Sequence, residues 1–398
     1  MSPGPGLHRT VLPKSFFASG ANCGVRRYRP DLGIITSEKE AVTVATYTTN
    51  ECQAAPLIYC RELLPSRRIR AVVTNSGQAN AATGELGLQR NFAMAEAAAR
   101  SLGVETSQVL TASTGVIGHQ IEIDKIVQAM PELIARSTNV AENFALSILT
   151  TDLVPKAVTT VVRLSQGEVR ITGICKGSGM IHPNMATMLG YLLTDLQIEP
   201  ELAQSLLREA VDQSFNMISV DGDCSTNDIT FFMANGASGV ALKDEEDYCK
   251  FKDALFEVAR FLAQAIAADG EGATKLIEVT IRGAPDLELA RRAARGVTLS
   301  PLIKSAIHGA NPNWGRILAR LGAEKVPASC LQKTVISLQS VAVFADGSPL
   351  EFDRRCLHDQ LKQSKVQIDI DLASGKEEAV AWGCDLSKQY IDINTEYS

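Results

Sequence analysis

The chain has 398 residues, of which 45% are hydrophobic and 21% charged, and its formal net charge is −6. This composition is typical of a soluble globular protein with room for two or three domains. The negative balance gives no reason to expect nucleic acid or an anionic membrane surface as a partner. No apolar stretch approaches the roughly 20 residues that a membrane-spanning helix needs.

Cysteine usage points to the same class of protein. The nine cysteines are scattered along the chain, with no Cys-x-x-Cys motif and no histidine at metal-ligand spacing. An unpatterned, odd-numbered set of this kind predicts thiols in a reducing compartment and no metal site. The first residues contain no apolar signal core, so the expected location is the cytoplasm.

The first half of the chain alternates β-rich runs with helical stretches. Runs rich in β-branched residues predict strands, and Ala-rich or amphipathic runs predict helices. One of these helices is expected to end at Gly103. The predicted strands are 33–36, 41–47, 69–74 and 108–112, the predicted helices are 91–102, 121–130 and 140–149, and 157–164 with 169–174 forms a predicted hairpin.

The second half repeats this mixture without an internal repeat. The predicted strands are 188–193, 277–281, 334–338, 341–344, 366–370 and 390–393, and the predicted helices are 200–213, 244–268 and 301–308. Strands and helices mixed in this way predict an α/β or α+β fold, in which helices cover the sheets.

The segment between the hairpin and the strand at 188–193 has the features of a self-cleaving junction. It reads Lys176-Gly-Ser-Gly-Met-Ile-His-Pro-Asn-Met-Ala-Thr-Met-Leu189. Its two glycines and Pro183 allow unusual backbone torsions, and strain at the Ala186–Thr187 bond would help the threonine hydroxyl attack the preceding carbonyl. Cleavage would give Thr187 a free α-amino group beside its hydroxyl, a base and a nucleophile in one residue. From the residues alone, an ordinary β-branched strand residue is the commoner role.

This junction resembles the processing site of the ornithine acetyltransferases (glutamate N-acetyltransferases) of arginine biosynthesis. Further blocks resemble the family in family order, from about Thr10 to the C-terminus. They are Thr74-Asn-Ser-Gly-Gln-Ala-Asn-Ala-Ala-Thr-Gly84, Thr111-Ala-Ser-Thr-Gly-Val-Ile-Gly118, Thr150-Thr-Asp152, Asp223-Cys-Ser-Thr-Asn-Asp228, Gly270-Glu-Gly-Ala-Thr-Lys275 and Pro312-Asn-Trp-Gly-Arg316. Several long motifs in order form a far more specific signal than any single Gly-rich loop.

The resemblance implies a fold and an assembly. The expected fold is α/β, with a sandwich-like α+β core in which Thr187 heads a central strand, and a smaller additional α/β domain at about 280–398. Cleavage would leave an α segment, 1–186, and a β segment, 187–398, which similar proteins assemble as a heterotetramer of two of each. No cofactor is expected, although some relatives accept acetyl-CoA as a substrate.

The resemblance also assigns an oxyanion hole to Thr114 and Gly115. Acyl transfer develops negative charge on a carbonyl oxygen, and fixed hydrogen-bond donors stabilise that charge. Gly115 would let the backbone approach closely, while the Thr114 hydroxyl or amide can donate. From the residues alone, an ordinary turn after a strand is the expected role of this pair.

The implied substrate contacts are Thr151, Lys176, Thr187, Glu271 and Asn394. Lys176 could hold a substrate carboxylate as a point charge, and Glu271 could meet the cationic amine of an ornithine-like substrate. Each also has an ordinary alternative: a solvated lysine, a helix cap for Thr151, a surface turn for Glu271 and a terminal tail for Asn394.

A few positions depart from the family pattern or from a competing motif. Gln78 and Asn311 replace an expected Asn and Asp, and Ser398 ends the chain where similar proteins continue to a hydroxyl contact, so that contact is not assigned here. The acidic loop 221–228 is no calcium loop, because Thr226 stands at the glycine position and Phe232 at the position of the bidentate glutamate. We expect this loop to organise hydrogen bonds near the active site.

The expected function is therefore acetyl transfer from N2-acetyl-L-ornithine to L-glutamate through an acetyl-Thr187 intermediate. One alternative is an N-terminal-nucleophile amidohydrolase or aminopeptidase, in which water replaces glutamate as the acceptor. A second alternative is an uncleaved relative that only binds amino acids.

Overall fold

The computed structural model describes residues 10–182 and 188–396. The chain divides into two compact units that each draw on separate parts of the sequence. Unit 1 comprises Met1–Gly177, Asn184–Phe215 and Cys224–Leu262, and unit 2 comprises Ser178–Pro183, Asn216–Asp223 and Ala263–Ser398. The predicted division of the covalent chain into segments 1–186 and 187–398 stays a prediction.

Unit 1 is built on an eight-stranded sheet with the strand order β4-β3-β2-β9-β7-β6-β5, and β1 also pairs with β2. The long strand β2 joins two parts of this sheet, because its first half pairs with β1 and β3 and its second half with β9. The strands are β1 Phe16–Ala21, β2 Leu32–Tyr47, β3 Ser66–Gln78, β4 Val109–Val116, β5 Lys156–Leu164, β6 Gly167–Lys176, β7 Leu189–Thr194 and β9 Ile229–Ala234.

The two parts of the sheet face each other across a shared apolar core. Val72 of β3 and Leu110 of β4 belong to the same buried cluster as Tyr191 of β7 and Phe231 of β9. The Tyr191 hydroxyl also lies 2.7 Å from the hydroxyl of Thr74 on β3. Strands buried on both faces are expected to be continuous apolar runs rather than alternating ones. The strands β7 and β9, which are buried at every position, are mostly apolar throughout.

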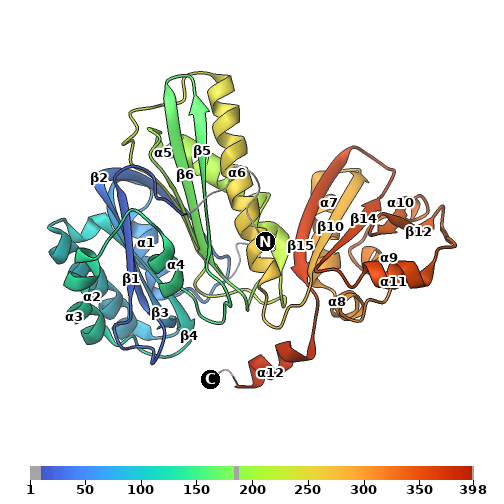
Figure 1. The fold of residues 1–398 in the computed structure, drawn as a ribbon, viewed down its shortest axis with the longest axis horizontal. Coiled ribbons are helices and arrows are strands. Elements are labelled where there is room, and N and C mark those ends of the chain that lie inside the picture. The colour runs from blue at the N-terminus through green and yellow to red at the C-terminus, as the bar shows by residue number, and fades with distance from the viewer. Residues whose placement is uncertain (1–9, 183–187, 397–398) are drawn as a thin grey trace. The chain divides into compact units, whose positions relative to one another are not determined.

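Helices cover the outer faces of this sandwich. Helix α2 (Gly84–Leu102) packs on β3 and β4, and α3 (Ile123–Ala135) packs on α2, β1 and β2; together they bury a cluster that includes Ala71 and Val73 (Figure 1). On the other part, α5 (Pro200–Asp212) packs on β2 and β9, and α6 (Glu245–Ala268) packs on β6, where Gly173 leaves room for its side chains. The predicted sandwich-like α/β core, with β7 as a central strand, is confirmed.

Some local predictions for unit 1 hold and others do not. Helix α2 begins at Gly84, before the predicted start at 91, and ends at Gly103, whose φ of 69° is left-handed. The helix expected at 140–149 is shorter in the structure, where α4 spans Glu142–Ser147. The sequence patterns missed β1, β9 and the helix α1 (Ala55–Leu63).

Unit 2 is built on a seven-stranded sheet with the order β13-β12-β11-β14-β10-β15-β8. Helix α7 (Leu287–Leu299) packs on the central strands β10 and β15. The strands are β8 Ile218–Ser219, β10 Leu276–Ala284, β11 Val335–Leu338, β12 Val341–Ala345, β13 Ser348–Pro349, β14 Lys365–Asp371 and β15 Glu377–Cys384. The other helices are α8 Pro301–His308, α9 Trp314–Ala323, α10 Ala328–Leu331, α11 Arg354–Gln360 and α12 Lys388–Glu396.

The strand predicted at 390–393 is wrong, because these residues lie in α12. Their alternation of apolar and polar residues resembles a strand over four positions, but Ile391 is 61% exposed and marks no buried face. The polar groups are instead satisfied locally, since Asn394 donates to the carbonyl of Tyr390 and Thr395 to that of Asp392. An alternating pattern over four residues is too short to distinguish a strand from a helix.

Two properties bear on the kind of site to expect. Within residues 10–182 and 188–396, no helix combines the length and the apolarity required to cross a membrane. The same residues contain no group of three or more His, Cys, Asp or Glu side chains arranged to hold a metal ion.

Candidate active site

The two residues of the predicted cleavage site, Ala186 and Thr187, lie outside the described residues, but both flanks of the junction are described. The chain leaves β6 at Lys176 and enters β7 at Leu189, and these two residues are paired neighbours in the antiparallel ladder. The site can therefore be built from the ends of β6 and β7 and from the side chains that surround them.

Lys176 is buried at the end of β6, with only 4% of its surface exposed. Its amine donates hydrogen bonds to Thr114 Oγ1 at 3.2 Å and to Thr150 Oγ1 at 3.0 Å. The alternative of a solvated loop lysine is therefore wrong. The structure brings together Lys176 and Thr114, two residues predicted for different tasks and 62 positions apart in the chain.

Asp152 anchors this lysine and the start of the junction. The carboxylate is 1% exposed and accepts from Lys156 Nζ and from the Gly177 amide, both at 2.7 Å. Burial by itself would raise the pKa of Asp152, but the charges of Lys156 and Lys176 and the hydrogen bonds hold it well below its usual range. An ionised carboxylate thus fixes the peptide that directly follows Lys176. The sequence reasoning missed this role, although Asp152 belongs to a recognised block.

Thr151 lies between two residues with clear contacts. Its neighbour Thr150 accepts a hydrogen bond from the Lys176 amine through its hydroxyl, and the Thr150 amide donates to Asp152 Oδ2 at 3.1 Å. The sequence analysis named Thr151 from this block and gave no role to Thr150, which contacts Lys176 in the structure. The role of Thr151 in substrate binding stays a prediction.

Thr114 and Gly115 end β4 beside the end of β3. Gly115 pairs with Gly77 in the parallel ladder, and its φ of +131° is one that L side chains rarely adopt. A Cβ atom at Gly115 would lie 2.2 Å from the Gly77 carbonyl carbon, so only glycine fits. This close approach is between the backbones of β4 and β3. The oxyanion-hole role of this pair stays a prediction.

The loop before β9 contributes two buried polar residues to the same region. Asn227 donates to the carbonyls of Ser113 and Ala79, and Asp228 accepts from the amide of Met188, the first described residue after the junction. Sequence reasoning expected this loop to organise hydrogen bonds near the active site, but it could not identify the partners.

Within unit 2, the structure brings Glu271 and Asn394 together. Asn394 donates from Nδ2 to Glu271 Oε2 at 2.8 Å, and the Glu271 amide donates to the Ser178 carbonyl. A Cβ atom at Gly179 would lie 2.3 Å from Glu271 Oε1, so a larger residue at this position would displace the carboxylate. Glu271 is therefore part of a packed turn, tied to the C-terminal helix and to the start of the junction.

The surroundings of Glu271 are acidic. Burial raises the pKa of Tyr390 to about 12, and the charges of Asp221, Glu271 and Asp223 act in the same direction. Asp221 is itself held by the amides of Met180 and Ile181, yet burial still raises its pKa. Several carboxylates gathered around one tyrosine create a negative potential that attracts a cation.

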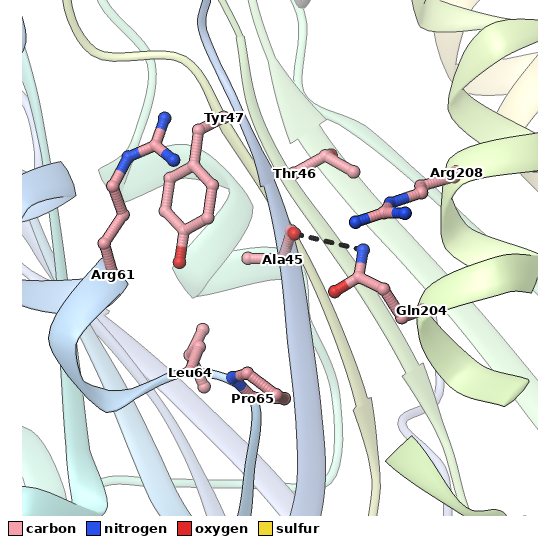
Figure 2. Close-up of a pocket in the computed structure, with 8 residues that line it drawn as sticks. All are labelled: Ala45, Thr46, Tyr47, Arg61, Leu64, Pro65, Gln204 and Arg208. Atoms are coloured by element: carbon pink, nitrogen blue, oxygen red, sulfur yellow. Dashed lines mark hydrogen bonds between the residues drawn. The ribbon is translucent and has the colours of Figure 1, made fainter. Parts of the chain in front are cut away.

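A separate open pocket of about 410 Å³ lies between β2, the end of α1 and α5. Figure 2 shows the Arg61 guanidinium stacked over the Tyr47 ring, at 4.1 Å from its centroid, and Gln204 bonded to the Ala45 carbonyl. None of the predicted site residues lines this pocket.

Comparison with known proteins identifies the family. A model of the ArgJ family matches residues 17–398. The arginine biosynthesis bifunctional protein ArgJ of Thermotoga neapolitana is 42% identical over 394 residues, which cover 97% of this chain and 99% of that protein. A chloroplastic ArgJ of Sorghum bicolor is 42% identical over 97% of this chain and 86% of its own. The crystal structure of ArgJ from Bacillus halodurans, 36% identical, covers 53% of this chain and 100% of the solved one with a TM-score of 0.51. The chain belongs to the ArgJ family.

Proposed function

We propose that this protein transfers the acetyl group of N2-acetyl-L-ornithine to L-glutamate and so releases L-ornithine and N-acetyl-L-glutamate. Family membership over nearly the whole chain supports this activity, and the relatives named above are proteins of arginine biosynthesis. The structural observation that carries the proposal is the buried amine of Lys176 bonded to Thr114, at the paired ends of the two strands that flank Thr187.

The proposed reaction is a double displacement on Thr187. Its Oγ attacks the acetyl carbonyl while its α-amino group takes the hydroxyl proton and passes it to the leaving ornithine amine. The amine of glutamate then attacks the acetyl ester, its proton returns through the α-amino group to Oγ, and N-acetylglutamate leaves. Both tetrahedral intermediates carry an oxyanion, for which Thr114 and Gly115 are the proposed donors.

The contact with Lys176 suits Thr114 for this task. Lys176 donates to Thr114 Oγ1, so the hydroxyl accepts in that bond and keeps its own proton for another acceptor. A hydroxyl polarised by a buried cation is also a stronger donor than a solvated one. This arrangement supports the assignment of the Thr114 hydroxyl to the developing oxyanion.

The nucleophile requires cleavage between Ala186 and Thr187. In the proposed reaction Thr187 Oγ attacks the Ala186 carbonyl, the peptide nitrogen leaves as the new α-amino group, and water hydrolyses the ester. The solved ArgJ chain from Bacillus halodurans is matched along its full length while it covers 53% of this chain, which equals the share of a β segment 187–398. We further propose that two α and two β segments assemble.

The proposed substrate contacts divide by charge. Glu271 and Asn394 are proposed to bind the side-chain amine of ornithine, which the acidic surroundings of Glu271 favour. Lys176 and Thr151 are proposed to bind the substrate carboxylate.

The proposed reaction needs no cofactor. A second activity, glutamate acetylation from acetyl-CoA, is proposed because the relatives are named bifunctional. All nine cysteines are free thiols, which supports a reducing, cytoplasmic location.

The test is incubation of the purified protein with acetylornithine, with and without glutamate. We expect equimolar ornithine and N-acetylglutamate when glutamate is present and little ornithine when it is absent. Release of acetate and ornithine at an unchanged rate without glutamate would identify the amidohydrolase instead, and no product in either case would identify a binding protein. Intact mass spectrometry should show two chains divided at Ala186–Thr187.

A further inference from the structure

We infer that Asn227 and Asp228 are a pair of positioning residues that fix the proposed oxyanion-hole peptide at Thr114 relative to the backbone at Met188, directly before β7. They are consecutive residues in the loop that leads into β9. One holds the end of β4 and the other holds the start of β7. The inference rests on the proposed function and adds to it two residues that do not contact the substrate themselves.

Asn227 holds the end of β4. Its side-chain amide is 5% exposed and donates to the Ser113 carbonyl at 2.9 Å and to the Ala79 carbonyl at 2.6 Å. The Ser113 carbonyl belongs to the same planar peptide as the Thr114 amide, so a bond to one fixes the direction of the other. Asn227 is itself held, since its Oδ1 accepts from the Thr226 hydroxyl and its backbone amide donates to Ser225 Oγ.

Asp228 holds the start of β7. Its Oδ1 accepts from the Met188 amide at 2.9 Å, and the Met188 carbonyl accepts from the Ile229 amide at 3.2 Å. The Met188 nitrogen is half of the peptide bond that joins it to Thr187. A hydrogen bond to this amide therefore restrains the backbone at Met188, one residue before β7 begins at Leu189.

The carboxyl of Asp228 is in an unusual environment. It is buried, and Oδ2 has no hydrogen-bond partner among residues 10–182 and 188–396. Burial raises its pKa well above its usual range, against the opposing effects of the Met188 amide, the Ser225 hydroxyl and the Lys176 charge. A neutral acid accepts at Oδ1 through its carbonyl oxygen, so the bond to Met188 does not require ionisation. The bond between the Met188 amide and Oδ1 is what suits Asp228 for a positioning role.

The loop that carries the pair is braced against the end of β2. Thr48 donates from its amide to the Asp228 carbonyl and from its hydroxyl to the Ser225 carbonyl, and Asn50 donates to the Cys224 carbonyl. Adjacent Cα atoms are 3.8 Å apart, so two side chains on consecutive residues give the two anchored peptides little freedom to separate. A misplacement of about 1 Å can lower a rate by about 10²-fold.

The chain contains a matched control for Asn227. Asn235 follows the opposite end of β9, is 6% exposed, and donates from Nδ2 to the Lys14 carbonyl and to Ser37 Oγ. Substitution of either asparagine by alanine removes two hydrogen bonds that a buried side-chain amide donates, at one end or the other of β9. A purely structural role for Asn227 therefore predicts similar behaviour of the two variants in every assay.

The test compares Asn227→Ala with Asn235→Ala in fully cleaved enzyme, with the cleaved fraction measured by intact mass. We expect both melting temperatures to fall by similar amounts. For Asn227→Ala we expect kcat to fall by about 10- to 100-fold with the KM values for acetylornithine and glutamate little changed. Asn235→Ala should keep its kcat. Equal kcat values for the two variants would overturn the inference.

Asp228 is tested by two substitutions, of which the first is isosteric with the wild-type residue. They also test the inference if the alanine variant of Asn227 fails to fold. Asp228→Asn keeps an acceptor for the Met188 amide and should keep most of the wild-type kcat, while Asp228→Ala should lose about 10-fold or more. Equal loss in both would assign the proton of Asp228 to the chemistry and overturn the positioning role. Absence of N-acetylglutamate in the wild-type reaction would instead contradict the proposed function, so the two failures are distinguishable.

Discussion

The Lys176 amine donates a hydrogen bond to the Thr114 hydroxyl over 3.2 Å, inside the protein and at the paired ends of β6 and β7. A buried ammonium group is costly unless its donors are used, and here Thr150 accepts a second bond. The two hydroxyls and the nearby Asp152 carboxylate therefore stabilise a cation at the place where the proposed reaction develops negative charge.

The first prediction concerns the nucleophile. Thr187→Ala should leave the chain uncut and inactive. Without the hydroxyl, the chain cannot cleave itself, so the α-amino group that serves as the base is never released. Thr187→Ser keeps the hydroxyl and should still cleave, with reduced turnover. Intact mass and an acetyl-transfer assay measure both effects. Wild-type turnover by Thr187→Ala would exclude residue 187 as the nucleophile.

The second prediction concerns the buried lysine. Lys176→Met should lower kcat/KM for acetylornithine by about 10²-fold, since it removes a donor and a charge next to the developing oxyanion. Lys304 provides the control, because it is also a buried lysine and donates to the Cys384 carbonyl in unit 2. Lys304→Met should lower the melting temperature but leave kcat/KM of the folded enzyme close to wild type. Similar kinetic losses in both variants would contradict a specific role for Lys176.

The third prediction follows from the low pKa of Asp152. A carboxyl whose pKa is lower in the folded state stabilises the fold above its unfolded pKa of about 3.9, and this stabilisation is lost as the pH falls toward the folded pKa. Asp152→Asn should therefore lower the free energy of unfolding at pH 7 by about 3–5 kcal/mol, because it leaves Lys156 buried without its partner.

Urea titrations at a series of pH values measure this effect. Wild type should lose stability steeply below about pH 4, and Asp152→Asn should show a shallower dependence there. Asp359→Asn is the control, because its partner Lys362 and Asp359 itself are exposed, so removal of that pair should change little. Parallel acid curves for wild type and Asp152→Asn would contradict the assigned pKa shift.

The fourth prediction concerns substrate charge. Glu271→Gln keeps an oxygen to accept from Asn394 but removes the negative charge, so the KM for acetylornithine should rise by about 10-fold or more. The KM for glutamate and the extent of self-cleavage should stay close to wild type. Steady-state kinetics and intact mass measure these quantities. An equal loss of self-cleavage would place Glu271 in processing rather than in substrate binding.

The fifth prediction separates steric from conformational effects at two glycines. Gly115 and Gly118 both have positive φ, at +131° and +85°, but only at Gly115 would a Cβ atom meet another backbone within 4 Å. Gly118→Ala should cost about 1–2 kcal/mol of unfolding free energy, because an L residue at this positive φ is strained, while Gly115→Ala should cost more and also lower kcat. Comparable stability and activity in the two variants would contradict the close approach of β4 and β3.

Local sequence patterns predicted the elements whose signals are complete within one stretch of chain. The β5–β6 hairpin, α6 and α8 were predicted within a few residues of their structural bounds. The helix α12 was not, because its four-residue alternation is too short to distinguish a strand from a helix. Strand β9 was missed because its pattern has no period: all six residues are buried, from both sides of the sheet.

The sequence by itself determined the family, and with it the candidate nucleophile, the Thr114–Gly115 pair and the charged residues Lys176 and Glu271, because these depend on motifs that are contiguous in the chain. Only the tertiary structure decided which distant residues are in contact. Lys176 meets Thr114, Asn227 meets Ser113, and Glu271 meets Asn394 at separations of 62, 114 and 123 residues. Such contacts form because folding brings together segments that are distant in the chain. A buried polar group without a hydrogen-bond partner is costly, so each of these residues requires a partner in the folded protein.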